Sequence, residues 1–188
     1  MALCDRTTLM QCYKTLCPED PDTRYGTRYI ERFSINLPVE KIDLDKWIRG
    51  MTDADYTSYS RAHKAMGSFT KDNVFYMTNV ENIGIETLIQ HYELRYHSAT
   101  HVQFYSPKSK AYIMRWFPAT IAVPWEMYVE PVSTYNSQLT CMIGVDFPGP
   151  GLRLASWLSS LGGQFLRKHL IEEAQAFAID IEHKFQKF

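Results

Sequence analysis

Apolar and polar residues alternate along several parts of the chain. The clearest case is Leu139–Phe147, where every second residue is apolar, so this segment predicts a strand with one buried face. Elsewhere the alternation of apolar and polar residues is weaker, and proline, glycine or polar residues mark the ends of each segment. These segments predict the remaining strands. They are Tyr29–Leu37, Val74–Asn79, Ile85–His97, His101–Tyr105, Ala111–Phe117 and Glu126–Val132, with a turn at 106–110 between the fourth and fifth of these.

The last fifth of the chain has a helical pattern instead. Leu152–Phe185 contains no proline, and its only glycines are Gly162 and Gly163. We therefore predict one continuous helix, which would extend about 50 Å at ~1.5 Å per residue. Two shorter helices are predicted after Pro38 and after Thr52, where proline or acidic residues occupy first-turn positions.

The order of these elements is a strand, two short helices, about six strands and a long helix. Such segregation favours an α+β fold with one antiparallel sheet. A curved sheet wrapped around the last helix would bury that helix's apolar stripe. Because regular structure is predicted from residue 28, residues 1–27 are interpreted as an N-terminal extension and residues 28–188 as one domain.

Composition and charge exclude several classes of function. The formal net charge is −1 and there is no basic run, which argues against a nucleic-acid partner. No window approaches the ~18 apolar residues of a membrane span. The first residues lack the apolar core of a secretory signal, so we expect a cytoplasmic location. The four cysteines form no Cys-x-x-Cys pair, which disfavours a zinc ribbon or a redox dithiol.

The predicted order resembles the helix-grip fold of the START, birch-pollen-allergen and polyketide-cyclase superfamily. The likeness covers residues 28–185 and rests on the opening strand, the helix pair after Pro38, the strand series and the Pro148–Gly151 boundary before the last helix. It implies a cavity between the sheet's concave face and that helix. Members of the superfamily hold lipids, sterols, hormones or polyketide intermediates there, and some of them catalyse reactions.

His169 and Glu173 are the most informative polar residues. They are four positions apart, on the same ridge as Phe165 and Phe177, and project only about 40° from each other. One interpretation is a buried or edge pair that merely satisfies itself. The other is an acid–base histidine held by its carboxylate, or half of a metal site.

The resemblance suggests how a metal site could be completed. Phloroglucinol-type carbon–carbon hydrolases of the same superfamily carry such a pair on their last helix, joined by His and Glu from strands. Here the strand candidates are His97, His101, Glu126 and Glu130, of which we take His101 and Glu130 as the alternative metal set with His169 and Glu173. Of the other histidines, we place His63, His91 and His183 at the surface.

Our leading interpretation is a carrier or sensor for an apolar or aromatic small molecule, with no cofactor. The alternative is a cyclase, a dehydratase or a metal-dependent hydrolase that uses His169 and Glu173; a partner-binding domain with a filled core is the third. Arg115 is expected to pair with an acid or to contact an anionic group of the ligand. The residues expected at the cavity are Tyr92, Tyr96, Phe104, Met114, Arg115, Trp116, Trp125, Phe165, His169 and Glu173.

Overall fold

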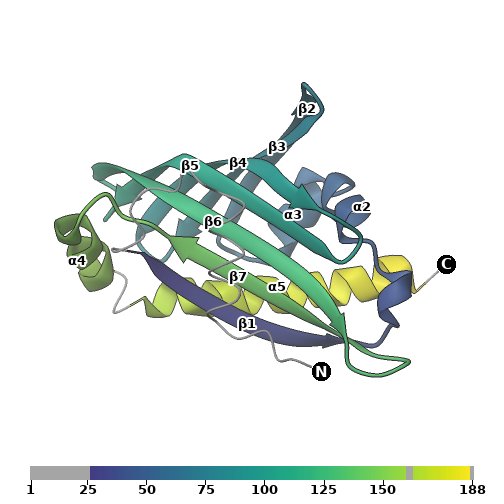
Figure 1. The fold of residues 1–188 in the computed structure, drawn as a ribbon. Coiled ribbons are helices and arrows are strands. Elements are labelled where there is room, and N and C mark those ends of the chain that lie inside the picture. The colour runs from purple at the N-terminus through teal and green to yellow at the C-terminus, as the bar shows by residue number, and fades with distance from the viewer. Residues whose placement is uncertain (1–25, 160–162, 187–188) are drawn as a thin grey trace.

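One antiparallel sheet dominates the computed structural model, which describes residues 26–159 and 163–186 (Figure 1). Its strands are β1 (Thr27–Ile35), β2 (His63–Lys71), β3 (Val74–Ile83), β4 (Glu86–His97), β5 (His101–Ile113), β6 (Phe117–Pro131) and β7 (Ser137–Val145). Their order across the sheet is β1-β7-β6-β5-β4-β3-β2. Strands β2 to β7 thus form a meander, and β1 closes it by pairing with β7.

Helices occur at two places along the chain, after the first strand and after the last one. A 3-10 turn η2 (Val39–Lys41) and the helices α2 (Leu44–Arg49) and α3 (Asp53–Tyr59) follow β1, while α4 (Pro150–Ser159) and α5 (Gln164–Phe185) follow β7. Helix α3 begins with a capping box, in which Thr52 and Asp55 each bond the other's backbone N–H. Asp43 caps the N-terminus of helix α2, because its carboxylate accepts from the Lys46 N–H.

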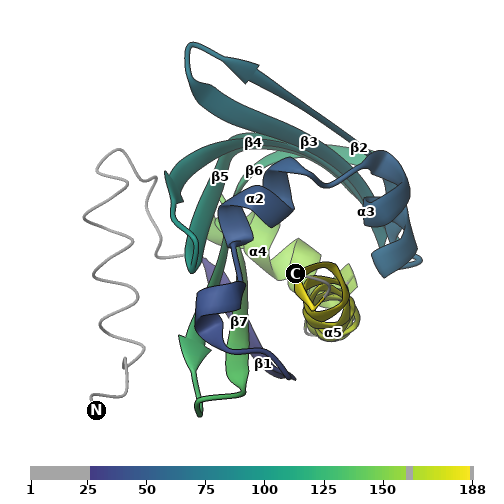
Figure 2. The same cartoon turned by 90° about the vertical axis from the view of Figure 1, so that its right-hand side faces the viewer.

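The sheet curls around α5, which lies in its concavity (Figure 2). Leu170, Ala174, Phe177 and Ile181 form the buried stripe of this helix and belong to the core of the sheet's inner face. A hydrogen bond also joins α2 to α5, because the Trp47 indole N–H of α2 donates to Asp180 of α5 over 2.7 Å. The predicted α+β architecture, a curved sheet around a long C-terminal helix with short helices after the first strand, is confirmed.

The prediction of one continuous helix from residue 152 is wrong. Helix α4 ends at Ser159 and α5 begins at Gln164. Gly163 has a left-handed backbone, with φ of 83°, and the Tyr29 hydroxyl occupies the space that a Cβ at this position would need. Only glycine suits such a position, so Gly163 separates the two helices.

Two strand predictions also need correction. Strand β2 was not predicted, because His63 and Met66 are its buried residues and the rest of it is exposed. The expected turn at 106–110 is absent, since β5 passes through it with a register shift between Ser106 and Ser109. The two serine hydroxyls bond each other over 2.7 Å inside the sheet, which lets the strand absorb the extra residues.

The N-terminal extension predicted for residues 1–27 lies almost entirely outside the described residues, and β1 begins at Thr27. Within 26–159 and 163–186, no helix is both long and apolar enough to cross a membrane.

Candidate functional site

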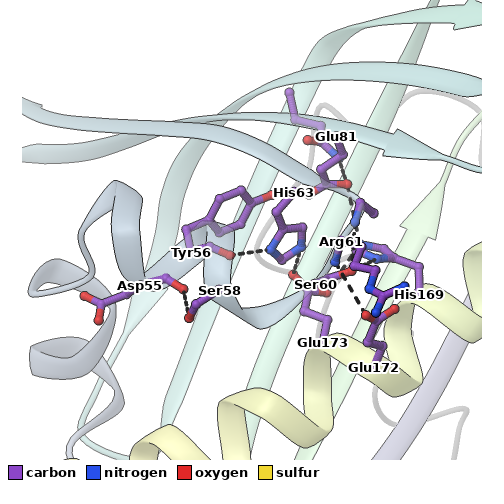
Figure 3. A network of polar contacts seen from close by, with 12 residues as sticks. Asp55, Tyr56, Ser58, Ser60, Arg61, His63, Glu81, His169, Glu172 and Glu173 are labelled. Atoms are coloured by element: carbon purple, nitrogen blue, oxygen red, sulfur yellow. Dashed lines mark hydrogen bonds and ion pairs between the residues drawn. The ribbon is translucent and has the colours of Figure 1, made fainter.

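Four ionisable side chains converge in the interior between the sheet and α5 (Figure 3). They are His63 from β2, Glu81 from β3, and His169 and Glu173 from α5. All four are buried, with exposed fractions of 2–4%. Each offers one possible ligand atom, and these atoms all lie within 4.8 Å of one another.

Local structure explains why the four residues meet. His63 and Glu81 are directly opposite each other in the β2–β3 register, so their side chains share the inner face of the sheet. His169 and Glu173 are one helical turn apart on the face of α5 that packs on the sheet. A cross-strand pair and a helical pair thus approach each other from opposite sides.

Hydrogen bonds behind the cluster fix the two imidazoles. The His63 Nδ1–H donates to the Tyr56 carbonyl over 2.6 Å, since a carbonyl can only accept, and the Tyr56 ring stacks on the imidazole at 3.9 Å. The Ser60 hydroxyl lies 3.3 Å from Nδ1 of His169. Both rings therefore turn their Nε2 atoms toward the carboxylates of the cluster.

Glu81 is held through both of its carboxylate oxygens. Its Oε1 accepts a short hydrogen bond from the Tyr56 hydroxyl, and its Oε2 accepts from the Gln90 amide over 3.1 Å. Burial, and then the charges of Glu81 and Glu173, raise the pKa of Tyr56 and of Tyr92 well above the usual phenol value. Both phenols therefore keep their protons at neutral pH.

The atoms at the centre of the cluster lack hydrogen-bond partners. His63 Nε2 is 3.4 Å from Glu173 Oε1, while His169 Nε2 is 3.7 Å from Glu81 Oε2 and 4.0 Å from Glu173 Oε2. In the described part of the chain, neither Nε2 atom nor Glu173 Oε2 makes a hydrogen bond, although all three are buried. Burying polar atoms that make no hydrogen bond costs free energy of folding, so these three atoms need a physical explanation.

The electrostatics of Glu173 likewise show an unusual polar group in the interior. Burial alone would raise the pKa of its carboxyl group, but His63 and the charge of His169 hold that pKa below its usual value. Glu173 is therefore an anion in the interior. Nitrogen and oxygen ligands of zinc lie ~2.0–2.2 Å from the metal, so neighbouring ligands in a tetrahedron are ~3.4 Å apart. Three of the separations within the cluster, 3.4, 3.7 and 4.0 Å, are close to this spacing, and all of the ligand atoms lie within 4.8 Å of one another.

The structure joins His169 and Glu173 to a different pair of residues from the one expected. His101 lies on the outer face of the sheet, where its Nε2 is 2.6 Å from Glu126 Oε1, and Glu130 is exposed. Neither belongs to the cluster, because the neighbouring residues Val102 and Val129 take the inward positions. The expectation of a surface His63 is also wrong, since this residue opens the strand that sequence reasoning missed.

The predicted cavity residues divide into two groups. Tyr92, Phe104 and Trp125 are buried, and their rings pack together at centroid distances of 5.3–6.0 Å. The second group lies on the surface, because β4 ends beyond the core and β5 and β6 turn at its edge. Its members are Tyr96, Met114, Arg115 and Trp116, while Phe165 packs half-buried at the start of α5.

A small cavity lies at the α4 end of the molecule. Its volume is about 80 Å³, below the ~300–1,000 Å³ typical of ligand pockets. Its lining is mostly apolar and includes Tyr29, Ile83, Leu88, Trp157 and Leu166. Leu166 precedes His169 by three residues, so the cavity lies about one helical turn from the cluster.

No protein-family model and no curated protein matches the chain, but solved structures do. TTHA0849 from Thermus thermophilus aligns with a TM-score of 0.61 at 9% identity, over 82% of this chain and 97% of that one. The chain has the helix-grip fold. The Zhui aromatase/cyclase from Streptomyces sp. R1128 aligns at 0.57 and 7% identity, over 86% and 94% of the two chains. A START superfamily protein from Mycobacterium smegmatis aligns at 0.52 and 12% identity, over 83% and 97%.

Proposed function

We propose that this protein is a metal-dependent hydrolase that acts on a small apolar or aromatic carbonyl compound. His63, Glu81, His169 and Glu173 would hold one divalent ion, with zinc as the first candidate. The observation that carries the proposal is the convergence of these four buried side chains, with their ligand atoms within 4.8 Å of one another. Mixed imidazole and carboxylate ligands are the set that zinc and related transition metals use.

Charge balance favours an ion over a set of internal salt bridges. Two carboxylates and two neutral imidazoles would leave two negative charges in a dry interior, and a divalent cation neutralises them. Protonated imidazoles could also balance the charge, and Glu173 raises the pKa of His63 against the opposing effect of burial. A protonated imidazole paired with a carboxylate ordinarily forms a hydrogen bond of ~2.7–2.9 Å, however. The Nε2-to-oxygen distances of 3.4–4.0 Å are longer than that.

A bound ion would polarise a substrate carbonyl and lower the pKa of a bound water toward neutrality. The residues of the chain supply the rest of the chemistry. Tyr56 keeps its phenolic proton and donates it in a hydrogen bond to Glu81, a member of the cluster. Such a proton donor can stabilise an oxygen or carbon that gains negative charge during bond cleavage. Gln90 holds the second oxygen of Glu81 in place.

The substrate class follows from the surroundings of the cluster. The nearest cavity is lined mainly by apolar and aromatic side chains, which suits a ring or a short acyl chain. Two His and two Glu, drawn from strands and the last helix, are also the arrangement implied by the resemblance to phloroglucinol-type hydrolases. We therefore propose an acylated aromatic compound, with water cleaving the bond between acyl group and ring to give a carboxylic acid and an arene C–H.

Metal analysis of the purified protein tests this function. We expect about one zinc, manganese or iron ion per chain, and its loss in Glu173→Gln and His63→Ala. The matched control is His101→Ala, because His101 also contacts a buried glutamate but lies on the outer face. A wild-type protein that neither contains nor takes up any of these ions, and is not stabilised by them, would contradict the proposal.

A non-catalytic carrier is the second candidate, and the apolar cavity near α4 supports it. The two functions differ in their response to His169→Ala. In a hydrolase this change should abolish turnover of an acylated aromatic ester or ketone. In a carrier it should reduce affinity for the same compound only modestly, since the imidazole would then be one contact among many.

A further inference from the structure

Exposed apolar side chains gather at the α4 end of the molecule. We call this set the apolar rim, and it consists of Ile85, Met114, Trp116, Phe117, Leu154, Trp157 and Leu158. Trp116 is 82% exposed and Leu158 is 61% exposed. Such a concentration of large apolar groups at one place on a surface marks an interaction site.

Three separate segments bring the rim together. Ile113, at the base of the β5–β6 turn, lines the same cavity as Trp157 of α4. The Ser156 hydroxyl donates to Glu86 over 3.4 Å, which links α4 to the β3–β4 turn. Figure 1 shows α4 standing at this end of the sheet, away from the helices α2 and α3. The rim therefore lies beside the cavity near the cluster, and its member Trp157 lines that cavity.

The β5–β6 turn, which carries part of the rim, has an unfavourable backbone conformation. Met114 and Arg115 have φ values of 51° and 65°, in the left-handed region. The β2–β3 turn has nearly the same geometry, with φ values of 50° and 64°, but uses Asp72 and Asn73. Asp and Asn tolerate this conformation, whereas Met and Arg are disfavoured in it. Strain retained at an exposed tip indicates that the side chains have a role there.

The charges beside the rim have one predominant sign. Lys110, Arg115 and Arg153 are exposed at its edge. In the segments 85–86, 110–118 and 150–158, the single acidic residue is Glu86, which accepts the bond from Ser156. These three segments are therefore basic, although the whole chain has a formal net charge of −1. The surface is complementary to an anionic partner.

We propose that the apolar rim docks on the surface of an anionic lipid membrane. Indole rings and guanidinium groups on one surface suit the headgroup region of a bilayer, where each has an apolar part and a polar part to satisfy. Basic residues add attraction to anionic lipids. A second copy of the chain fits less well, because a two-fold contact through the rim would bring Arg115 and Arg153 toward like charges.

Tryptophan fluorescence with lipid vesicles tests the proposal, because the four tryptophans divide evenly. Trp47 and Trp125 are each 3% exposed, so a spectral change must come from Trp116 and Trp157. We expect a blue shift and co-sedimentation with phosphatidylcholine vesicles that contain phosphatidylglycerol, and much less of both with phosphatidylcholine alone. Replacing both exposed tryptophans by alanine should lower the partition coefficient by about tenfold or more.

Tyr135→Ala is the matched control, since Tyr135 is 77% exposed in the β6–β7 connection, far from the rim. This variant should bind vesicles like the wild type. The proposal is overturned if the wild type binds neither vesicle, or if the double alanine variant binds as well as the wild type. It is also overturned if the rim mediates a dimer that the double variant dissociates. Metal content is measured without lipid, so its outcome is separate from this one.

Discussion

The two ends of the sheet–helix interface are built differently. Around His63 and His169, the side chains are buried, the α3 N-terminus is capped, and hydrogen bonds from Tyr56, Ser60 and Gln90 fix the orientation of the polar groups. At the α4 end, a strained turn and a short helix present apolar groups to solvent. The contrast separates a buried, hydrogen-bonded polar cluster, which we propose as the reaction site, from an exposed apolar surface, which we propose as the docking surface.

The largest expected effect compares the core of α5 with the surface of α4. Phe177→Ala should lower the free energy of unfolding by about 3–5 kcal/mol, because the ring is fully buried against Trp47, Tyr59 and Trp125. Leu158→Ala should change it by less than about 0.5 kcal/mol. Urea denaturation measures both. Similar losses at the two sites would mean that α4 belongs to the cooperative core.

Removing the proposed metal ion should have the next largest effect. An ion at about 1,000 times its Kd stabilises the folded chain by about 4 kcal/mol. For a chain of this length, stripping it with a chelator should lower Tm by roughly 10 °C. Thermal unfolding followed by circular dichroism measures the shift. His63→Ala should unfold at the same temperature with and without chelator, and a wild type indifferent to chelator would contradict the metal site.

The next effect concerns a hydrogen bond that supports the cluster from outside. Tyr56→Phe removes the hydroxyl that donates to Glu81 and should weaken metal binding by about 10–100-fold. Competition with a chromogenic chelator measures this change. Tyr76→Phe is the control, because Tyr76 lies on β3 with Glu81 but away from the cluster. Equal affinities in both variants would show that Glu81 needs no such support.

The smallest expected effect concerns the strained turn. Replacing Met114 with Asn and Arg115 with Gly should stabilise the fold by about 1 kcal/mol, because these residues suit positive φ. The same variant should bind anionic vesicles more weakly than the wild type. Thermal unfolding and vesicle co-sedimentation together test this opposition. A variant that gains no stability would show that the wild-type turn is unstrained.

Periodicity predicted the architecture because most strands and α5 bury one face. Helix α5 was recognisable from Phe177, Ile181 and the other residues of its stripe. The boundary at Gly163 was visible as a glycine pair, but its left-handed backbone depends on Tyr29 from the other end of the chain. Strand β2 was not predicted, because nearly all of it is exposed and it therefore lacks alternating apolar residues.

The site was half predictable for a similar reason. His169 and Glu173 are neighbours through local helical geometry, which sequence spacing reveals. His63 and Glu81 are neighbours through the register of β2 on β3, and no pattern within either segment encodes that register. Glu81 occupies an inward position between the buried residues Asn79 and Ile83, where an apolar residue would be the ordinary choice. A polar run on an inward face was the signal available.

Two of the four converging side chains belong to the sheet and two belong to α5. An ion bound by all of them would therefore act as a cross-link between the helix and the strands that enclose it. Lifting α5 away from the sheet would break coordination bonds as well as apolar contacts. Release of the ion and opening of the fold would then be one event, observable as slow amide exchange in α5 that becomes fast when the ion is withdrawn.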